Sequence, residues 1–230
     1  MGKKLAVVQS SYIPWKGYFD LIHAVDEFVL FDDVQYTRRD WRNRNLIKTR
    51  GGPVWLTIPV NAKGNYLAAI KDVTVNDPEW PARHWKTICG AYRKAPHFEA
   101  HEELFARLYA ESTDASLSAI NRRFIDAICG LLGIGTRISW SMDYSLAPGR
   151  TERLVQLCQD IGADCYISGP SARAYIEPEL FRRGGIELVF FDYAGYREYE
   201  QLHPPFDHHV SILDLLFHVG SDAPRYMLTF

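Results

Sequence analysis

The chain has 230 residues, of which 47% are hydrophobic and 23% are charged, a composition typical of a globular protein rather than a disordered or fibrous one. Its formal net charge of -2 argues against the broad basic surface that nucleic acids and acidic membranes require. We therefore expect no binding of nucleic acid. No stretch reaches the roughly 18 uninterrupted apolar residues of a membrane span, so we also expect no membrane insertion.

The N-terminus and the cysteines indicate the compartment. The first apolar run ends at Gln9 and is too short for the apolar region of an export signal. The cysteines lie in apolar segments without a C-x-x-C pair, at Cys89, Cys129, Cys158 and Cys165. This usage is typical of buried thiols in a reducing compartment. We therefore expect a cytoplasmic protein with no metal or other cofactor.

The first half of the chain begins with a strand, a helix and a second strand. Residues 5–9 (LAVVQ) and 27–31 (EFVLF) are short apolar runs typical of strands buried on both faces. Residues 17–25 place Phe19 and Ile22 at helical spacing between them, which predicts a parallel crossover unit.

A hairpin and a helical segment are expected next. Residues 54–60 and 70–75 flank an Asn-Ala-Lys-Gly-Asn turn, which predicts an antiparallel hairpin. Residues 81–108 have a helical rhythm broken near Pro96, which predicts two helices, and residues 117–132 predict the longest helix.

The remainder alternates strands and helices. We expect strands at residues 137–140, 165–168 and 187–192, and helices at 151–161, before the last strand, and at 211–219. The expected fold is therefore one α/β domain spanning residues 1–230. It has a mostly parallel open sheet with helices on both faces, plus an appended β-hairpin and helical segment.

Ligands of such sheets bind beyond the carboxyl ends of the strands. The segment after the first strand carries Gln9, Tyr12, Trp15, Gly17 and Tyr18, which we interpret as substrate-binding residues, with Gly17 allowing close backbone approach. The alternative for the aromatic residues is that they pack on the core.

The segment after the second strand begins with Asp32 and Asp33. Adjacent carboxylates suit a general base or a divalent cation, and we take these two as the candidate catalytic residues. The alternative is that they serve as turn and helix-capping residues.

The same segment continues with polar and basic side chains. We expect Arg42, Arg44 and Lys48 to hold a phosphate or carboxylate of the substrate, with Gln35 and Asn43 orienting polar groups. The alternative is that the basic residues form a solvated face.

A third candidate segment follows the strand at residues 165–168. Ser168, Gly169, Ser171 and Arg173 are expected to form a turn that binds an anion through backbone amides and the arginine. The alternative is that these residues simply turn the chain.

Other chemistries lack a supporting pattern. His203, Asp207, His208 and His209 surround Pro204-Pro205 without the spacing of metal ligands. The G-x-S-x-G elbow of serine hydrolases, the G-x-G-x-x-G dinucleotide motif and the Walker phosphate loop do not occur.

Long segments of the chain resemble a known family. Residues 5–49, LAVVQSSYIPWKGYFDLIHAVDEFVLFDDVQYTRRDWRNRNLIKT, resemble the opening of the WbqC-like proteins of bacteria. The likeness continues in WLTIPV, LGIGTRI, GRTERLVQLCQDIGADCYISGPSARAYI and SILDLLFHVG, and so covers most of the chain. Ser10-Ser11 departs from the Pro-Asn or Pro-Ser that the family more often shows.

The resemblance implies a place in the synthesis of O-antigen and other surface polysaccharides. We therefore expect acyl or aminoacyl transfer to a nucleotide-linked amino sugar, with a nucleotide sugar or a carrier-bound acyl donor as small-molecule substrate. One alternative is a non-catalytic sugar-nucleotide binding or scaffolding protein. Another is a nucleotidyltransferase-like enzyme, although Trp15 and Tyr18 stand where the histidines of an H-x-G-H signature would be.

Overall fold

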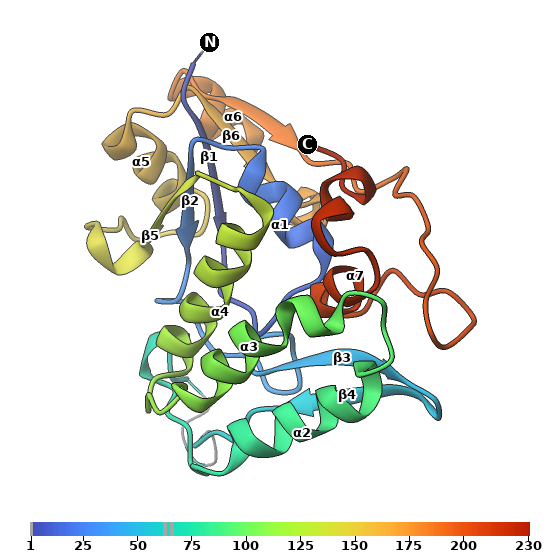
Figure 1. Ribbon diagram of the computed structural model, residues 1–230. Coiled ribbons are helices and arrows are strands. Elements are labelled where there is room, and N and C mark those ends of the chain that lie inside the picture. The colour runs from blue at the N-terminus through green and yellow to red at the C-terminus, as the bar shows by residue number, and fades with distance from the viewer. Residues whose placement is uncertain (1, 62–63, 65–66) are drawn as a thin grey trace.

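The computed structural model describes residues 2–61, 64 and 67–230. Its centre is a parallel sheet of five strands in the order β5-β2-β1-β6-β7 (Figure 1). The strands are β1 (Lys4–Val8), β2 (Glu27–Leu30), β5 (Arg137–Trp140), β6 (Cys165–Ser168) and β7 (Glu187–Phe190). From β1 the chain adds strands outward on one side and then returns to add β6 and β7 on the other. The strand order therefore reverses between β1 and β6, which is where open parallel sheets form a ligand crevice.

Helices cover both faces of this sheet. In β1, Ala6 packs into the core shared with α1 (Lys16–His23) and α4 (Leu117–Leu132). Leu5 and Val7 point the other way, into the core shared with α5 (Glu152–Ile161) and α6 (Pro178–Arg183). This alternation is the period of two of a strand buried on both sides. The α/β architecture predicted from the sequence is confirmed.

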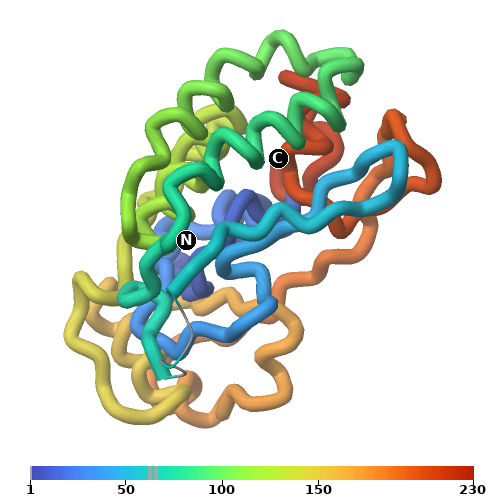
Figure 2. Tube along the Cα trace, turned by 90° about the horizontal axis from the view of Figure 1, so that it is seen from below, coloured from blue at the N-terminus to red at the C-terminus, as the bar shows by residue number. Residues whose placement is uncertain are grey.

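A second group of elements packs beside α4. It contains α2 (Trp80–Tyr92), α3 (Phe98–Ala110), α7 (Ile212–Val219) and a hairpin of β3 (Arg44–Thr49) and β4 (Gly52–Thr57) (Figure 2). Short 3-10 helices are η1 (Ile70–Asp72), η2 (Ser141–Asp143), η3 (Pro170–Ala174) and η4 (Gly220–Tyr226). The break between α2 and α3 lies where Pro96 predicts it, and α4 ends at Gly133 in the left-handed conformation, with a φ of 71°.

The hairpin differs from the prediction. Its strands are residues 44–49 and 52–57 rather than 54–60 and 70–75, and the predicted turn falls partly outside the described residues. Val60 and Val75 form only an isolated antiparallel bridge. The error has a physical cause, because β3 buries the polar Asn45 and Lys48, so the strand does not show as an apolar run.

A long connector, residues 191–211, joins β7 to α7 without helix or strand and runs beside the hairpin (Figure 2). Its tyrosines bond to buried carboxylates: Tyr196 Oη donates to Asp20 at 2.6 Å and Tyr199 Oη to Asp214 at 2.8 Å. Lys48 Nζ donates to Gln201 Oε1 at 2.7 Å. These bonds hold the connector against α1, α7 and β3. Within the described part of the chain, no helix is both long and apolar enough to cross a bilayer.

Candidate functional site

A cavity of about 1110 Å³, here called the main cavity, opens at the carboxyl edge of the sheet. Its floor comes from the last residues of β1, and Ser168 and Gly169 at the end of β6 form one side. It therefore lies where the strand order reverses, the position at which ligands bind in open α/β sheets. Its volume is that of a site for a whole small molecule.

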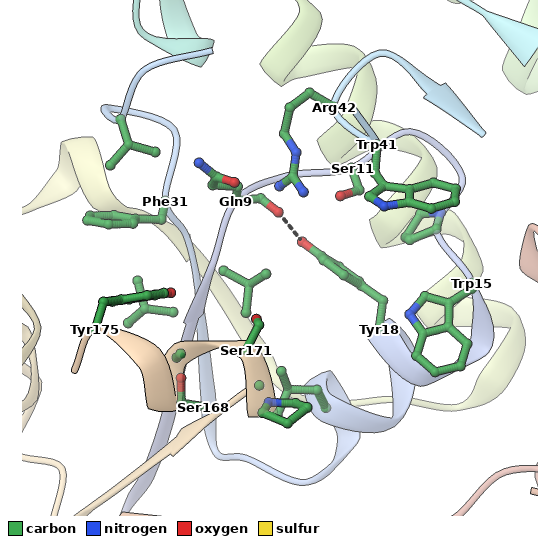
Figure 3. A pocket seen from close by; sticks show the side chains of 18 of the residues that line it. Gln9, Ser11, Trp15, Tyr18, Phe31, Trp41, Arg42, Ser168, Ser171 and Tyr175 are labelled. Atoms are coloured by element: carbon green, nitrogen blue, oxygen red, sulfur yellow. Dashed lines mark hydrogen bonds between the residues drawn. The ribbon is translucent and has the colours of Figure 1, made fainter. Parts of the chain in front are cut away.

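The loops that follow β1 and β2 form adjoining walls of this cavity (Figure 3). The loop after β1 contributes Gln9, Trp15 and Tyr18, and the loop after β2 contributes Gln35 and Arg42. The two strands are paired in register, so their carboxyl ends bring both loops to one place. Five of the residues selected from the sequence thus line a single space.

Arg42 is the most informative of these residues. Its side chain is only 9% exposed, and its Nη1 donates to Ser10 O at 3.3 Å. Its Nε is buried without a hydrogen-bond partner, and among the described residues no carboxylate oxygen lies within 4 Å of its guanidinium. Figure 3 shows it pointing toward Gln9 and Tyr18. Asp40 is near enough for its charge to be felt, but a buried cation with no carboxylate in contact is costly, and an anionic ligand would reduce that cost.

Two further arginines carry positive charge to the opposite side. Arg150 lines the cavity from the segment before α5, and Arg153 lines it from the first turn of α5. The Arg150 guanidinium lies 5.3 Å from the Tyr175 ring centre, and the Arg153 guanidinium lies 6.0 Å from that of Phe31. No aspartate or glutamate is among the described residues that line the cavity. The cavity is therefore suited to an anion.

Aromatic rings supply much of the remaining surface. Trp15, Tyr18, Phe31, Trp41 and Tyr175 line the cavity, as Figure 3 shows. Burial raises the pKa of Tyr18 well above its ordinary value, so its hydroxyl stays protonated and donates to Gln9 O at 3.1 Å. Flat aromatic surfaces beside arginines fit a ligand that joins a planar ring to a phosphate.

Buried polar groups fix the shape of the loop after β1. Asp32 accepts a hydrogen bond from Ser10 N at 2.9 Å and another from Ser118 Oγ. Asn45 Nδ2 donates to the carbonyls of Tyr12 and Ile13, both at 3.0 Å. Ile13 has a φ of 37°, a backbone angle that residues other than glycine rarely adopt. These bonds therefore hold a strained turn.

Both candidate carboxylates lie outside the lining of the cavity. Asp32 is fully buried and is engaged by Ser10 and Ser118. Asp33 is half-buried and accepts a hydrogen bond from Ser141 Oγ at the start of η2. The geometry gives Asp32 the role of holding a loop.

Tyr12 and Gly17, which were also selected from the sequence, contact other protein groups rather than the cavity. Tyr12 is fully buried in the core, and its hydroxyl lies 2.9 Å from His84 Nδ1 and 2.6 Å from Tyr109 Oη. Gly17 faces the Trp15 indole, because a Cβ at this position would lie 2.3 Å from the ring. The absent side chain thus makes room for Trp15 rather than for a ligand.

The turn after β6 reaches the cavity only in part. Ser168, Gly169 and Ser171 line it. Ser171 lies inside η3 and does not cap it, since the cap position is Gly169. Arg173 turns away and places its guanidinium 4.1 Å from the Phe190 ring centre.

The other residues selected from the segment after β2 lie in different places. Lys48 faces the connector, where it donates to Gln201 and to Pro205 O. Asn43 and Arg44 line a second, smaller cavity. Of this segment, Arg42 alone among the predicted cations lines the main cavity.

Several lining residues are not among those selected from the sequence, including Asn45, Arg150, Arg153, Tyr193 and His209. A signal for the two arginines and for Tyr193 was present, because they follow the predicted strands at residues 137–140 and 187–192, and ligands bind beyond the carboxyl ends of such strands. His209 carries no such signal, since it lies at the far end of the irregular connector.

His209 has the geometry of an oriented imidazole. Its Nδ1 lies 3.2 Å from Asp207 Oδ1, and its backbone N–H donates to the same oxygen at 2.8 Å. Its ring stacks on Trp15 at 6.3 Å. A carboxylate at Nδ1 favours the tautomer whose Nε2 is free to accept a proton. Across the described residues, no group of three or more histidines, cysteines or acidic residues is arranged to hold a metal ion.

Comparison with known proteins gives two matches. The model of the WbqC-like protein family matches residues 9–226. Rv1507c, an uncharacterised protein of Mycobacterium tuberculosis (strain ATCC 25618 / H37Rv), is 50% identical over 225 residues, covering 98% of this chain and 97% of that protein. No solved structure matches the chain. The family match includes nearly all segments that build the main cavity, and the chain belongs to the WbqC-like protein family.

Proposed function

We propose that the chain is a transferase that binds a nucleotide-linked amino sugar in the main cavity and transfers an acyl or aminoacyl group to its amine. The observation that carries this proposal is Arg42, a buried arginine that lines the cavity without a carboxylate partner. With Arg150 and Arg153 it supplies the positive charge that a diphosphate requires. The aromatic lining supplies stacking surface for a base.

The proposed reaction needs a proton acceptor beside the amine. His209 fits this role because it lines the cavity and is oriented by Asp207. The amine nitrogen forms a bond to the acyl carbon of an activated donor and loses a proton to His209 Nε2. The bond from the acyl carbon to the leaving group breaks, and the leaving group takes that electron pair and then the proton from the imidazolium. Asp33, which bonds to Ser141 outside the lining, is the rival candidate for the base.

Nucleotide binding tests the first half of the proposal. The probes to titrate are ADP, UDP, GDP, CDP, dTDP and UDP-N-acetylglucosamine. We expect at least one of them to raise the melting temperature by binding the folded state. Arg42→Gln should weaken the affinity of that probe by about ten-fold or more, since a charge-assisted bond to phosphate is lost. The loss should be larger at low salt than at high salt.

Arg50→Gln is the matched control, because Arg50 is exposed at the hairpin turn and lines neither cavity. It removes the same charge and should leave the affinity unchanged. Equal affinities for the parent, Arg42→Gln and Arg50→Gln would contradict the anion site.

The base is tested with an acyl-coenzyme A and a UDP-linked amino sugar as probes, with amide formation followed by mass spectrometry. His209→Gln should lower the rate by about 10²-fold or more and leave nucleotide affinity within two-fold. Asp33→Asn should retain the parental rate. The reverse result would transfer the role to the carboxylate. A parent that binds the nucleotide sugar and forms no amide with any acyl donor favours the non-catalytic binding protein.

A further inference from the structure

A second cavity of about 240 Å³ lies beside the loop after β2 and the end of β4. Three arginines line it, Arg38, Arg39 and Arg44, and no acidic residue is among its described lining residues. Its volume falls below the range of sites that enclose a whole drug-sized molecule. It can receive one charged group of a ligand that extends out of it.

Asn43 provides this cavity with a hydrogen-bond acceptor whose orientation is fixed. Its side chain is 5% exposed, and its Nδ2 donates to Ile58 O at 2.8 Å, which fixes the orientation of the amide. Its Oδ1 is buried and has no hydrogen-bond partner. A buried acceptor without a donor costs free energy. A ligand that carries an N–H or O–H group would satisfy it.

Arg44 is held in place at the same cavity. Its guanidinium lies 4.0 Å from the Trp55 ring centre, and its Nη2 donates to Arg39 O. Its Nε is buried without a partner. Arg39 has a φ of 59°, a conformation that residues with a side chain rarely adopt. Residues in strained conformations persist where the surrounding structure determines them, and they cluster at ligand sites.

One carboxylate faces this set of arginines. Asp40 accepts hydrogen bonds from Thr37 Oγ1 at 2.5 Å and from Trp41 N at 2.7 Å. Burial raises the pKa of Asp40, but the Thr37 bond and the charges of Arg42 and Arg44 lower it more, so this carboxylate is ionised. Among the described residues, no carboxylate oxygen lies within 4 Å of the Arg39 or Arg44 guanidinium, and these two arginines keep the cavity positively charged.

The two cavities are neighbours across a few residues. Trp41 and Arg42 line the main cavity, whereas Asn43 and Arg44 line the second. Consecutive Cα atoms are about 3.8 Å apart, so the two sites meet across one segment of backbone. At the surface the Trp41 and Trp55 rings contact one another at 5.2 Å, and both are 40% exposed. They offer an apolar surface between the two cavities.

We propose that the second cavity binds the phosphate ester of the acyl donor, with Asn43 Oδ1 accepting a hydrogen bond from an N–H or O–H group close to that phosphate. The arm of the donor would cross the Trp41–Trp55 surface toward the main cavity. The role as donor site rests on the proposed transfer, whereas the binding of a phosphate ester rests only on the second cavity.

Isothermal titration with 4′-phosphopantetheine tests this inference, and pantetheine, the same arm without phosphate, is the matched probe. We expect 4′-phosphopantetheine to bind and pantetheine to bind at least ten-fold more weakly. Arg44→Gln and Arg38→Gln should each weaken phosphopantetheine about ten-fold, and Arg50→Gln should leave it unchanged. Arg38 is exposed, so Arg38→Gln gives the result even if Arg44→Gln fails to fold.

Arg42→Gln separates the two sites, because it should weaken the nucleotide probe and leave phosphopantetheine affinity unchanged. Loss of phosphopantetheine binding in Arg42→Gln, or its displacement by a saturating nucleotide, would place both ligands in the main cavity and overturn the inference. Equal affinity for pantetheine, or for inorganic phosphate, would also overturn it. Failure of every nucleotide to bind would contradict the proposed function and leave the phosphopantetheine result to decide the second cavity by itself.

Discussion

The region under the connector and the main cavity both contain a buried charge, and the two charges differ in how completely they are hydrogen-bonded. Under the connector, the fully buried Asp214 carboxylate accepts bonds from Tyr92 Oη at 2.9 Å, and from Tyr199 Oη and Gln201 Nε2, both at 2.8 Å. In the main cavity, Arg42 is nearly as deeply buried but makes one bond of 3.3 Å to a carbonyl.

The difference separates structure from binding. A buried charge surrounded by donors or acceptors already has its partners and contributes to holding the chain together. A buried charge that keeps unused hydrogen-bonding groups beside an open cavity is available to a ligand. The connector network therefore contributes to stability, and Arg42 is the charge that we propose for ligand binding.

The largest effect is expected at Asp214. Asp214→Ala leaves the Tyr92 and Tyr199 hydroxyls without their acceptor inside the protein, so the free energy of unfolding should fall by about 3 kcal/mol, measured by urea denaturation. Asp222→Ala is the control, since Asp222 is 55% exposed and pairs with the likewise exposed surface residue Arg225, and its effect should stay within about 0.5 kcal/mol.

Arg42→Gln tests the stability contribution of the buried charge in the main cavity. Removing a buried charge that no carboxylate contacts should leave the free energy of unfolding unchanged or raise it by up to about 1 kcal/mol. A loss as large as that of Asp214→Ala would mean that Arg42 is a structural cation, and the distinction between the regions would fail.

The last effect depends on pH and concerns Lys16, which lies in the connector region and donates to Arg197 O at 3.3 Å. Burial lowers the pKa of Lys16 from 10.5 to about 8, although Asp20 and Asp214 oppose this shift. Between pH 8 and 10.5 the unfolded chain therefore holds a proton that the folded chain has lost, and this contribution to stability rises with pH. The rise is at most about 1.4 kcal/mol per pH unit.

The measurement compares urea midpoints of the parent and Lys16→Met at pH 7.5 and 9.5. The parent should gain stability relative to the variant at the higher pH, and the comparison cancels the titration of buried tyrosines and cysteines. Lys71→Met, at an exposed lysine, should show no such difference. A constant gap between parent and Lys16→Met would show that the lysine keeps an ordinary pKa.

Much of the fold was readable because its strands are short apolar runs that alternate with periodic helices. The loop residues Gln9, Trp15, Tyr18 and Arg42 were found for the same reason, since each follows a recognisable strand end. The prediction of the hairpin strands was wrong because Asn45 in β3 is polar yet buried. Its side-chain amide donates hydrogen bonds to the backbone of the loop after β1.

The roles of individual polar residues were less accessible. Asp32 and Asp33 look alike in the sequence, and only the tertiary contacts from Ser118 and Ser141 show where each carboxylate is engaged. Tyr12 was assigned to the pocket because it lies between pocket residues, but a tight turn directs it into the core. His209 reaches the cavity through an irregular segment whose path follows from its contacts rather than from any periodic pattern.

The bonds that fix the loop after β1 have a consequence for how relatives of this chain can diverge. One wall of the main cavity is held by Asp32, Asn45 and the Tyr18 hydroxyl, so a substitution there disturbs several buried bonds at once. The facing wall carries the exposed residues Arg150 and Ser171, whose side chains can be exchanged at little cost. We expect descendants of this fold to keep the first wall and to acquire new substrates through the second.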